Sequence, residues 1–486
     1  MKIQTIGREN IFSAIKDIIL LEDGASHFIP VTGKGGSGKT MLFNQLQEYF
    51  HDNADEYPNV IVINYDFRDL RSQSFASTLY LNIRKMLQHN KKLFPSSAVK
   101  LFYRMLLTAP ESWDGLIKFS RRQVKHLINK GVRLVLLEDT VETIGAPSDY
   151  INNIFTIGAY LPNCVAIVAG RPEDNTLSHL EVINATLGNN DWVLHPPFEL
   201  LPFTLTETNQ FFQVHLNGLL PENQVAKIHL LTGGSPIHLA IVTEVLKHNP
   251  NLEILHEDMD QLKHQYEIDK TALLSRFEFN LMAEISNLGN TIDWTVLYLA
   301  YLNRRYDRKI IKLLLGGSDQ EIEALENKYR SLLYLRKTSL PSRENREMLH
   351  DEIQRMINTL IWERIDYLKD HRKSITNKVI EGYYMPEIQK YQQRLTVISN
   401  NGMNLEGMTR YMEDTFSLAE LQNECLDYLL RIDVSHGLAD FYQLVDEVNQ
   451  SQYPNFNRLL LHDGVKNLGL SRIIPPEEIR ARIYNP

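Results

Sequence analysis

The feature that most constrains this chain is a glycine-rich loop between an apolar stretch and a helical one. Gly33, Gly38, Lys39 and Thr40 match the spacing G-x-x-x-x-G-K-[ST]. The preceding segment, HFIPVTG, is typical of a short buried strand, and the following segment, KTMLFNQLQEYF, has the apolar spacing of one helix face. A glycine turn that opens a helix presents backbone N–H groups to a polyphosphate. The sequence therefore predicts a nucleotide-binding loop.

Each part of this loop has its own expected role. Glycines let successive N–H groups point into one concavity. Lys39 is expected to reach the β- and γ-phosphates, and the hydroxyl of Thr40 is expected to ligate Mg²⁺. The alternative, a chance glycine-rich turn, is disfavoured by the strand before it and the helix after it. The residues that we expect at the nucleotide are Gly33, Gly35, Gly36, Ser37, Gly38, Lys39, Thr40 and Met41.

A pair of acidic residues ends a second apolar strand, GVRLVLLEDT. An NTPase needs one carboxylate there to hold Mg²⁺ and a second to orient the attacking water. Glu138 occupies the position where Asp is usual, and Asp139 follows it, so the sequence leaves open which acid has which role. Both are candidate metal ligands and catalytic groups. The alternative is a turn in which Asp139 caps a helix.

A cation ends the next apolar strand, CVAIVAGRPED. Arg171 at this strand tip is a candidate catalytic residue, because a guanidinium there can approach the γ-phosphate and report its presence. The alternative is a surface arginine in the turn before Pro172.

Short apolar strands alternate with helical stretches over residues 1–197. The strands that we expect are HFIPVTG, NVIVINYDF, VRLVLLED, CVAIVAG and WVLHPPF. They are nearly continuous runs of Val, Ile and Leu, as in strands that are buried on both faces. Helical crossovers between such strands produce a parallel sheet with helices on both sides. We expect an α/β P-loop nucleotide-binding domain of the AAA type here.

Beyond residue 197 the pattern is helical. Residues 198–268 are expected to form a helical lid domain. Residues 269–352 contain helices and then two short apolar stretches, LLYLRKT and REMLHDE, which predict a hairpin and hence a winged helix. Residues 353–486 are expected to be α-helical, with DEIQRMINTLIWERIDYLKDH as the clearest helix. They show no clean repeat, so a degenerate repeat array and a sensing or oligomerisation segment both stay open.

Composition excludes several classes of protein. The 486 residues are 43% hydrophobic and 23% charged, as in soluble globular proteins. A net charge of −9 leaves no chain-wide basic field for nucleic acid or an anionic membrane. No apolar run approaches the ~20 residues of a membrane span, and we expect no secretory signal at the N-terminus. The two cysteines, Cys164 and Cys425, exclude a disulfide framework and favour a cytoplasmic protein.

The order of these motifs resembles the STAND class of AAA-related signalling ATPases, with their NB-ARC-like module. The resemblance covers about residues 5–355 and rests on IGREN, GKGGSGKT, LLED, LTGGSPIHLA and MLHDEI. It implies that Gly7 and Arg8 lie near the adenine and ribose, that Pro236 packs against the adenine, and that His350 contacts the β-phosphate of ADP. Proline offers a flat apolar ring, and histidine can donate to phosphate. The alternatives are a helix-start proline and a capping or solvated histidine.

This resemblance implies a switch with slow ATP hydrolysis. ADP holds the module closed, and exchange for ATP with Mg²⁺ promotes opening and homo-oligomerisation, most commonly in defence or stress sensing. The IGREN stretch begins within ten residues of Met1. An effector or trigger protein is therefore expected as a separate chain, as a partner of the C-terminal helices, or in a longer protein of which this chain is a piece.

Two other functions come from different classes. The first is a DNA-binding loader or regulator that resembles the origin-recognition ATPases, using the stretch LNRRYDRKIIK on phosphates. Acidic residues follow directly in SDQEIEALE, which favours a solvated helix face and leaves nucleic acid a less favoured partner. The cations concerned are Arg304, Arg305, Arg308, Lys309 and Lys312. The second is a small-molecule kinase, for which no acceptor site is evident.

Overall fold

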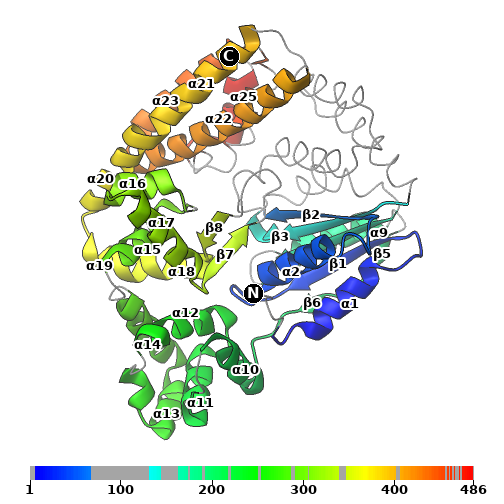
Figure 1. The fold of residues 1–486 in the computed structure, drawn as a ribbon, viewed down its shortest axis with the longest axis vertical. Coiled ribbons are helices and arrows are strands. Elements are labelled where there is room, and N and C mark those ends of the chain that lie inside the picture. Colours follow the sequence, from blue (N-terminus) through cyan, green and yellow to red (C-terminus); the bar gives the residue numbers. More distant parts are fainter. Residues whose placement is uncertain are drawn as a thin grey trace.

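The computed structural model describes residues 6–66, 131–143, 163–172, 176–188, 192–216, 220–249, 253–285, 290–304, 306–338, 346–400 and 405–451, and most of residues 453–484. A parallel sheet carries the N-terminal part of the chain (Figure 1). A cluster of helices lies below it, a second cluster with a two-stranded hairpin lies beside it, and long helices from the C-terminal part lie above (Figure 1).

The sheet confirms the predicted α/β fold. Its strand order is β2–β3–β4–β1–β5, with β6 beside β1, and all its pairings are parallel. Every residue of β1, β3 and β4 is buried, which explains their continuous apolar sequences. The strands are β1 (Ser26–Thr32), β2 (Val60–Asp66), β3 (Arg133–Asp139), β4 (Cys164–Gly170), β5 (Trp192–Leu194) and β6 (Phe198–Glu199).

The predicted strand WVLHPPF is two short strands rather than one. β5 ends at Leu194 and β6 begins at Phe198, with Pro196 and Pro197 between them. Proline has no N–H to donate to a neighbouring strand, so the pairing with β1 is interrupted at this point.

One face of the sheet is covered by α1 (Glu9–Ile19) and α2 (Lys39–Asp52). Side chains that alternate along β1, β3 and β4 join one apolar cluster with Leu42, Phe43 and Leu46 of α2. On β3 these are Val135 and Leu137, so the alternation of a strand places Asp139 on the same face. Glu138 then lies on the opposite face, which fixes what each acid can reach.

The helical lid predicted over residues 198–268 contains α10 (Leu205–His215), α11 (Glu222–Thr232), α12 (Pro236–His248) and α13 (Met259–Ile268). α14 (Lys270–Ile285), expected in the winged helix, packs against α11, α12 and α13 (Figure 1). Asp269 ends α13, and its carboxylate accepts a hydrogen bond from the N–H of Ala272 at the start of α14. The polar break at Asp269 is therefore a corner between two packed helices, and because α14 also packs against the π-helical turn Ile357–Trp362, the boundary at residue 268 stays a prediction.

The winged helix contains the predicted helices and hairpin. Its helices are α15 (Asn290–Leu302), α16 (Arg308–Leu315) and α17 (Asp319–Arg330). Strands β7 (Leu335–Thr338) and β8 (Arg346–Leu349) pair antiparallel, and β7 also contacts α2 of the nucleotide domain. The predicted polar turn SLPSREN lies outside the described residues.

The C-terminal part is helical, as predicted, but its clearest predicted helix is interrupted. α18 (Asp351–Met356) continues through a π-helical turn (Ile357–Trp362) into α19 (Glu363–Ile365), and the next helix, α20, begins at Asp370. Asp366 accepts hydrogen bonds from the N–H groups of His371 and Arg372, and Lys369 is left-handed with φ 62°. These local hydrogen bonds compete with a continuous helix.

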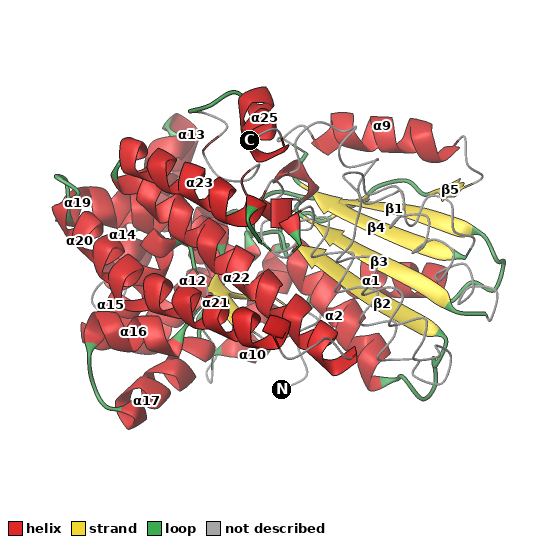
Figure 2. Ribbon diagram, turned by 90° about the horizontal axis from the view of Figure 1, so that it is seen from above, coloured by secondary structure: helices red, strands yellow, loops and turns green. Residues whose placement is uncertain are grey.

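Three long helices of this region, α21 (Met385–Asn400), α22 (Leu405–Ile432) and α23 (Val434–Asn449), lie side by side (Figures 1 and 2). No helix among the described residues is both long and apolar enough to span a bilayer. The other α-helices among the described residues are α9 (Thr176–Gly188), α20 (Asp370–Val379) and α25 (Pro476–Tyr484).

Candidate functional site

The glycine-rich loop has the backbone that its sequence predicts, between β1 and α2. Gly36 and Gly38 have φ of 75° and 98°, which L side chains rarely adopt, and Gly38 directly precedes α2. The ammonium of Lys39 donates to the carbonyls of Gly33 at 2.5 Å and of Lys34 at 3.0 Å, so it lies over the loop. Met41 is 44% exposed and takes no part in the core. The loop thus combines a cation with a helix N-terminus, which suits a polyphosphate.

Asp139 and Glu138 have different surroundings. The hydroxyl of Thr40 donates a hydrogen bond to Oδ2 of Asp139. Glu138 is fully buried on the other face, which it shares with Cys164, whose thiol pKa is raised by burial and by the Glu138 carboxylate. Asp139 is therefore the acid beside the expected Mg²⁺ ligand Thr40. The hydroxyl and carboxylate oxygens there are the ligand types that Mg²⁺ prefers.

A third acid, which the sequence analysis missed, follows these two. Thr140 has a left-handed φ of 61°, unusual for a β-branched residue, and it turns the chain into a short 3-10 helix, Val141–Thr143. This turn brings Glu142, whose side chain is only 4% exposed, to 3.4 Å from Nε of Arg171. The stretch LLEDTVE does contain this acid, but only the turn at Thr140 reveals that it faces the site.

Arg171 lies against the loop, as the functional interpretation of this strand tip requires. A Cβ placed on Gly35 would be 3.2 Å from the guanidinium carbon of Arg171. Nη2 of Arg171 is 3.8 Å from Oδ2 of Asp351, the first residue of α18. Arg171 therefore connects the phosphate loop to Glu142 on one side and to the winged helix on the other.

His350 both caps a helix and faces the loop. Its Nδ1 accepts a hydrogen bond of 3.2 Å from the N–H of Glu352, at the start of α18. Its Cε1 lies 3.8 Å from the position that a Cβ on Gly36 would occupy. With Nδ1 used as an acceptor, a neutral ring carries its proton on Nε2, which is then a donor.

The lid reaches the same loop through the residue after Pro236. Pro236 is the first residue of α12 and follows two left-handed glycines, Gly233 and Gly234. The next residue, Ile237, packs over the loop so closely that a Cβ on Gly36 would overlap its side chain. Pro236 is thus a helix-start proline whose helix lies at the nucleotide loop.

The N-terminal residues Gly7 and Arg8 hold the loop against the start of the lid. Arg8 donates to the carbonyls of Ser37 at 3.1 Å and of Leu201 at 2.5 Å, and its guanidinium lies 5.1 Å from the ring centre of Phe203. Gly7 is left-handed, and a Cβ on it would overlap the side chain of Glu207. Arg8 therefore stabilises the glycine-rich loop by joining it to the segment that precedes the lid.

Substituting Arg8 with methionine should loosen this support. Methionine keeps much of the side-chain volume but leaves the two carbonyls without their charged donor, and such hydrogen bonds contribute about 1.5–3 kcal/mol each. We expect a lower melting temperature and weaker nucleotide affinity, measured by calorimetry with and without ADP. Lys16→Met is the matched control, because Lys16 lies near α1's end without a hydrogen bond to the loop. An unchanged affinity in Arg8→Met would contradict a supporting role.

The basic stretch at residues 302–312 does not form a free cationic patch. Arg304 is buried and its Nη1 lies 2.5 Å from Glu424, and Arg308 lies 2.8 Å from Glu326. The other two described cations are paired as well: Lys309 with Glu387 at 2.5 Å and Lys312 with Asp319 at 2.6 Å. Arg305 lies outside the described residues. Arg308, Lys309 and Lys312 have exposed side chains and fit the solvated-face interpretation, whereas Arg304 is buried in an ion pair.

Comparison with known proteins gives structural similarities only. No protein-family model and no curated protein matches the chain. Among solved structures, it is similar to the Aeropyrum pernix ORC2 protein in ADPNP–ADP complexes, at 12% identity and TM-score 0.35 over 74% of this chain and 95% of that one. Cdc6p from Pyrobaculum aerophilum has 15% identity and TM-score 0.33 over 74% and 96%.

A third similar structure is the Aeropyrum pernix ORC1 protein in complex with DNA, at 12% identity and TM-score 0.36 over 75% of this chain and 94% of that one. Identities and TM-scores at this level assign the chain to no family. The resemblance to the STAND class therefore stays a proposal that rests on the motifs.

Proposed function

We propose that this chain is an ATPase in which bound nucleotide switches the arrangement of the nucleotide domain, the lid and the winged helix. The observation that supports this is the convergence of three side chains on the phosphate loop. Arg171 comes from β4, Ile237 from the lid, and His350 from the winged helix, and all three lie against Gly35 or Gly36. A change in the phosphates held by this loop would therefore act on the nucleotide domain, the lid and the winged helix at once.

The residues present fit ATP with Mg²⁺. The loop backbone and Lys39 are suited to the phosphates, and Thr40 with Asp139 offers oxygen ligands to the metal, which when bound neutralises charge on the phosphates. Arg171 is placed to contact the γ-phosphate. Glu142 is the acid that we assign to orienting the attacking water, since Glu138 projects from the other face of the sheet.

The switch follows from the charges around Arg171. In this structure the guanidinium has Asp351 of the winged helix as a neighbour at 3.8 Å. A γ-phosphate competes with that carboxylate for Arg171 and repels it, because both are anions. ADP leaves this contact intact, and we assign Nε2 of His350 to the β-phosphate. ATP thus favours release of the winged helix, and an effect of this kind shifts a two-state equilibrium.

The first test is nucleotide content and mass in solution. The protein would be purified, its bound nucleotide identified by chromatography, and its mass measured by light scattering before and after exchange to a non-hydrolysable ATP analogue with Mg²⁺. Retained ADP on a monomer that assembles with the analogue is the expected result. An empty site, or a mass and radius that the analogue does not change, would contradict the switch.

Substituting His350 should separate its two contacts. His350→Ala removes both the helix cap and the donor to phosphate, whereas His350→Asn keeps a side chain that caps α18 well. We expect ADP to dissociate about tenfold faster from both variants, because one charge-assisted hydrogen bond is lost. Stopped-flow release of a fluorescent ADP analogue measures this. If His350→Asn releases ADP at the normal rate, His350 acts only as a cap.

A DNA-binding loader or regulator is the second candidate. The hairpin carries Arg336, Lys337 and Arg346 by sequence, and its strand β7 contacts α2, so an opening of the module would uncover it. One of the similar solved structures is described as a complex with DNA. Fluorescence anisotropy with duplex DNA, in ADP and in the ATP analogue, distinguishes the candidates. Binding that appears with the analogue and weakens steeply with salt would favour this second function.

A further inference from the structure

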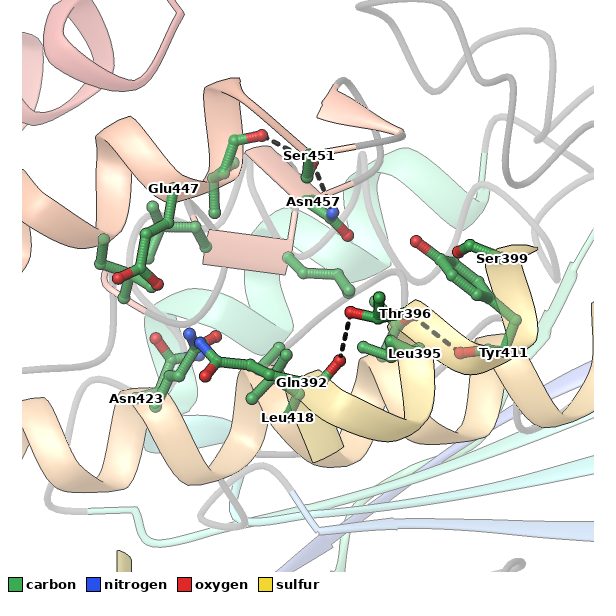
Figure 3. A pocket seen from close by; sticks show the side chains of 17 residues that line it. Gln392, Leu395, Thr396, Ser399, Tyr411, Leu418, Asn423, Glu447, Ser451 and Asn457 are labelled. Atoms are coloured by element: carbon green, nitrogen blue, oxygen red, sulfur yellow. Dashed lines mark hydrogen bonds between the residues drawn. The ribbon is translucent and has the colours of Figure 1, made fainter. Parts of the chain in front are cut away.

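A cavity of about 480 Å³ lies among the three long C-terminal helices, far along the chain from the phosphate loop. It lies between α21, α22 and α23, and Asn457, Leu460 and Leu461 also line it (Figure 3). Its volume is within the ~300–1,000 Å³ range of small-molecule sites. The site and the switch proposed above rest on different residues, so neither depends on the other.

The wall of this cavity is polar but nearly uncharged. Amide and hydroxyl side chains line it together with leucines and a valine, and among the described residues that line it Glu447 alone is charged. None of them is Lys, Arg or His, so the wall offers no cation to a phosphate or carboxylate ligand. The polar residues are Gln392, Thr396, Ser399, Tyr411, Thr415, Gln422, Asn423, Glu447, Ser451 and Asn457.

Two amide oxygens in this wall are buried without a hydrogen-bond donor. These are Oδ1 of Asn423 and Oδ1 of Asn457, which have no hydrogen-bond partner among the described residues. Asn423 is only 8% exposed. Asn457 uses its amide nitrogen to donate to Oγ of Ser451 at 2.8 Å, which orients its oxygen (Figure 3). Buried acceptors are satisfied in most native structures, so these two indicate a missing donor.

Three hydroxyls of the wall do not supply that donor, because each donates to a backbone carbonyl three or four residues earlier in its own segment. Thr396 donates to the carbonyl of Gln392 at 2.9 Å, and Ser451 to that of Val448 at 2.6 Å (Figure 3). Thr415 donates to the carbonyl of Tyr411 at 2.8 Å. The hydroxyl oxygens are left as further acceptors. A complementary ligand is therefore rich in N–H or O–H donors.

We propose that this cavity binds an uncharged nucleoside, with its base held by Asn423 and Asn457. A nucleobase has N–H donors on a flat edge, and asparagine side chains pair well with such edges. Tyr411, which is 4% exposed and lines the wall, offers an aromatic surface for stacking. A ribose supplies hydroxyl donors, and the absence of cations among the lining residues disfavours the phosphorylated forms.

The helix that carries Asn423 is also joined to the winged helix. Glu424, the next residue of α22, contacts Arg304 at 2.5 Å, and the hydroxyl of Tyr428 donates to the carbonyl of Leu302 at 2.7 Å. Leu302 is the last residue of α15. A nucleoside in the cavity therefore contacts a helix that is fixed to the winged helix by a buried ion pair.

The test is equilibrium dialysis of the full chain with radiolabelled adenosine, guanosine, cytidine and uridine. The protein is first saturated with ADP and Mg²⁺, so that the phosphate loop is blocked. We expect one of the four nucleosides to bind at one site per chain, and its monophosphate to bind at least tenfold more weakly. Lys39→Ala, which lacks the phosphate-loop cation, should bind the nucleoside with unchanged affinity.

Substitutions in the wall identify the site. Asn423→Leu and Asn457→Leu, each with the same branched shape as the native side chain, should weaken binding at least tenfold while circular dichroism and melting show a folded protein. Gln393→Leu, at an exposed amide on α21, is the matched control and should change nothing. Absence of binding by all four nucleosides would overturn the proposal. So would binding that survives both asparagine substitutions or disappears in Lys39→Ala.

Discussion

Replacing Lys39 with alanine should abolish nucleotide binding, with a loss in ATP and ADP affinity of about 100-fold or more. The ammonium lies over the glycine-rich loop, where it donates to the carbonyls of Gly33 and Lys34. When a nucleotide binds, the Lys39 ammonium is expected to donate to its phosphates instead of to these carbonyls. Charge-assisted hydrogen bonds to phosphate contribute about twice as much as neutral ones. Alanine removes every one of these bonds. Isothermal titration with ATP and ADP in the presence of Mg²⁺ measures the change.

Lys34→Ala is the matched control for this experiment. Lys34 belongs to the same loop and has the same charge, but its side chain is exposed. We expect the affinity of Lys34→Ala for ATP and ADP to change less than threefold. Because Lys39 also ties the loop together without ligand, the melting temperature of Lys39→Ala should be measured alongside. Normal ATP affinity in a folded Lys39→Ala protein would show that this loop is not the nucleotide site.

Local patterns were enough to predict most of the fold. The strands β1 to β4 follow from continuous apolar runs, and the loop follows from its spacing and from the strand and helix around it. The hairpin β7–β8 follows from two apolar stretches separated by polar residues. Each of these features is encoded in a short run of consecutive residues. Packing between distant segments does not alter them.

The arrangement of the acids depended instead on tertiary packing. Glu138 and Asp139 are adjacent in sequence, and their spacing is equally compatible with either role. What separates them is which face of β3 is covered by α2, a fact that no local pattern contains. Glu142 was missed for a related reason, since the left-handed Thr140 that aims it at Arg171 is not a residue type that predicts such a turn.

Contacts between residues that are far apart in the sequence also decide where some elements pack. α14 follows a polar break and has an ordinary amphipathic pattern, so its sequence does not reveal that it packs on the lid. Arg8 lies 193 residues from Leu201, whose carbonyl it binds. The motif in which Arg8 occurs predicts a position near the adenine and ribose, and that role stays a prediction; the structure shows hydrogen bonds from Arg8 to the carbonyls of Ser37 and Leu201.

Replacing Asp139 with asparagine should reduce ATP hydrolysis about 100-fold or more, while Glu138→Gln should have a much smaller effect. Asp139 shares the metal side of the sheet with Thr40, through a hydrogen bond from the Thr40 hydroxyl. Asparagine keeps the shape but removes the negative charge, and Mg²⁺ binds neutral amide oxygens less well than carboxylates. Glu138 faces away from the loop, so a neutral side chain of the same size there leaves the site intact.

The dependence on Mg²⁺ distinguishes a metal role from a general loss of activity. We expect Asp139→Asn to need a much higher Mg²⁺ concentration for half-maximal hydrolysis, with ATP affinity in the absence of metal unchanged. Glu142→Gln should behave differently, since it should bind MgATP normally but turn it over slowly, as expected for an acid that orients water. Titrating steady-state turnover with Mg²⁺ measures all three variants. If Glu138→Gln shifts the Mg²⁺ requirement and Asp139→Asn does not, the two acids have the opposite roles, and the alternation along β3 does not decide which side chain meets the metal.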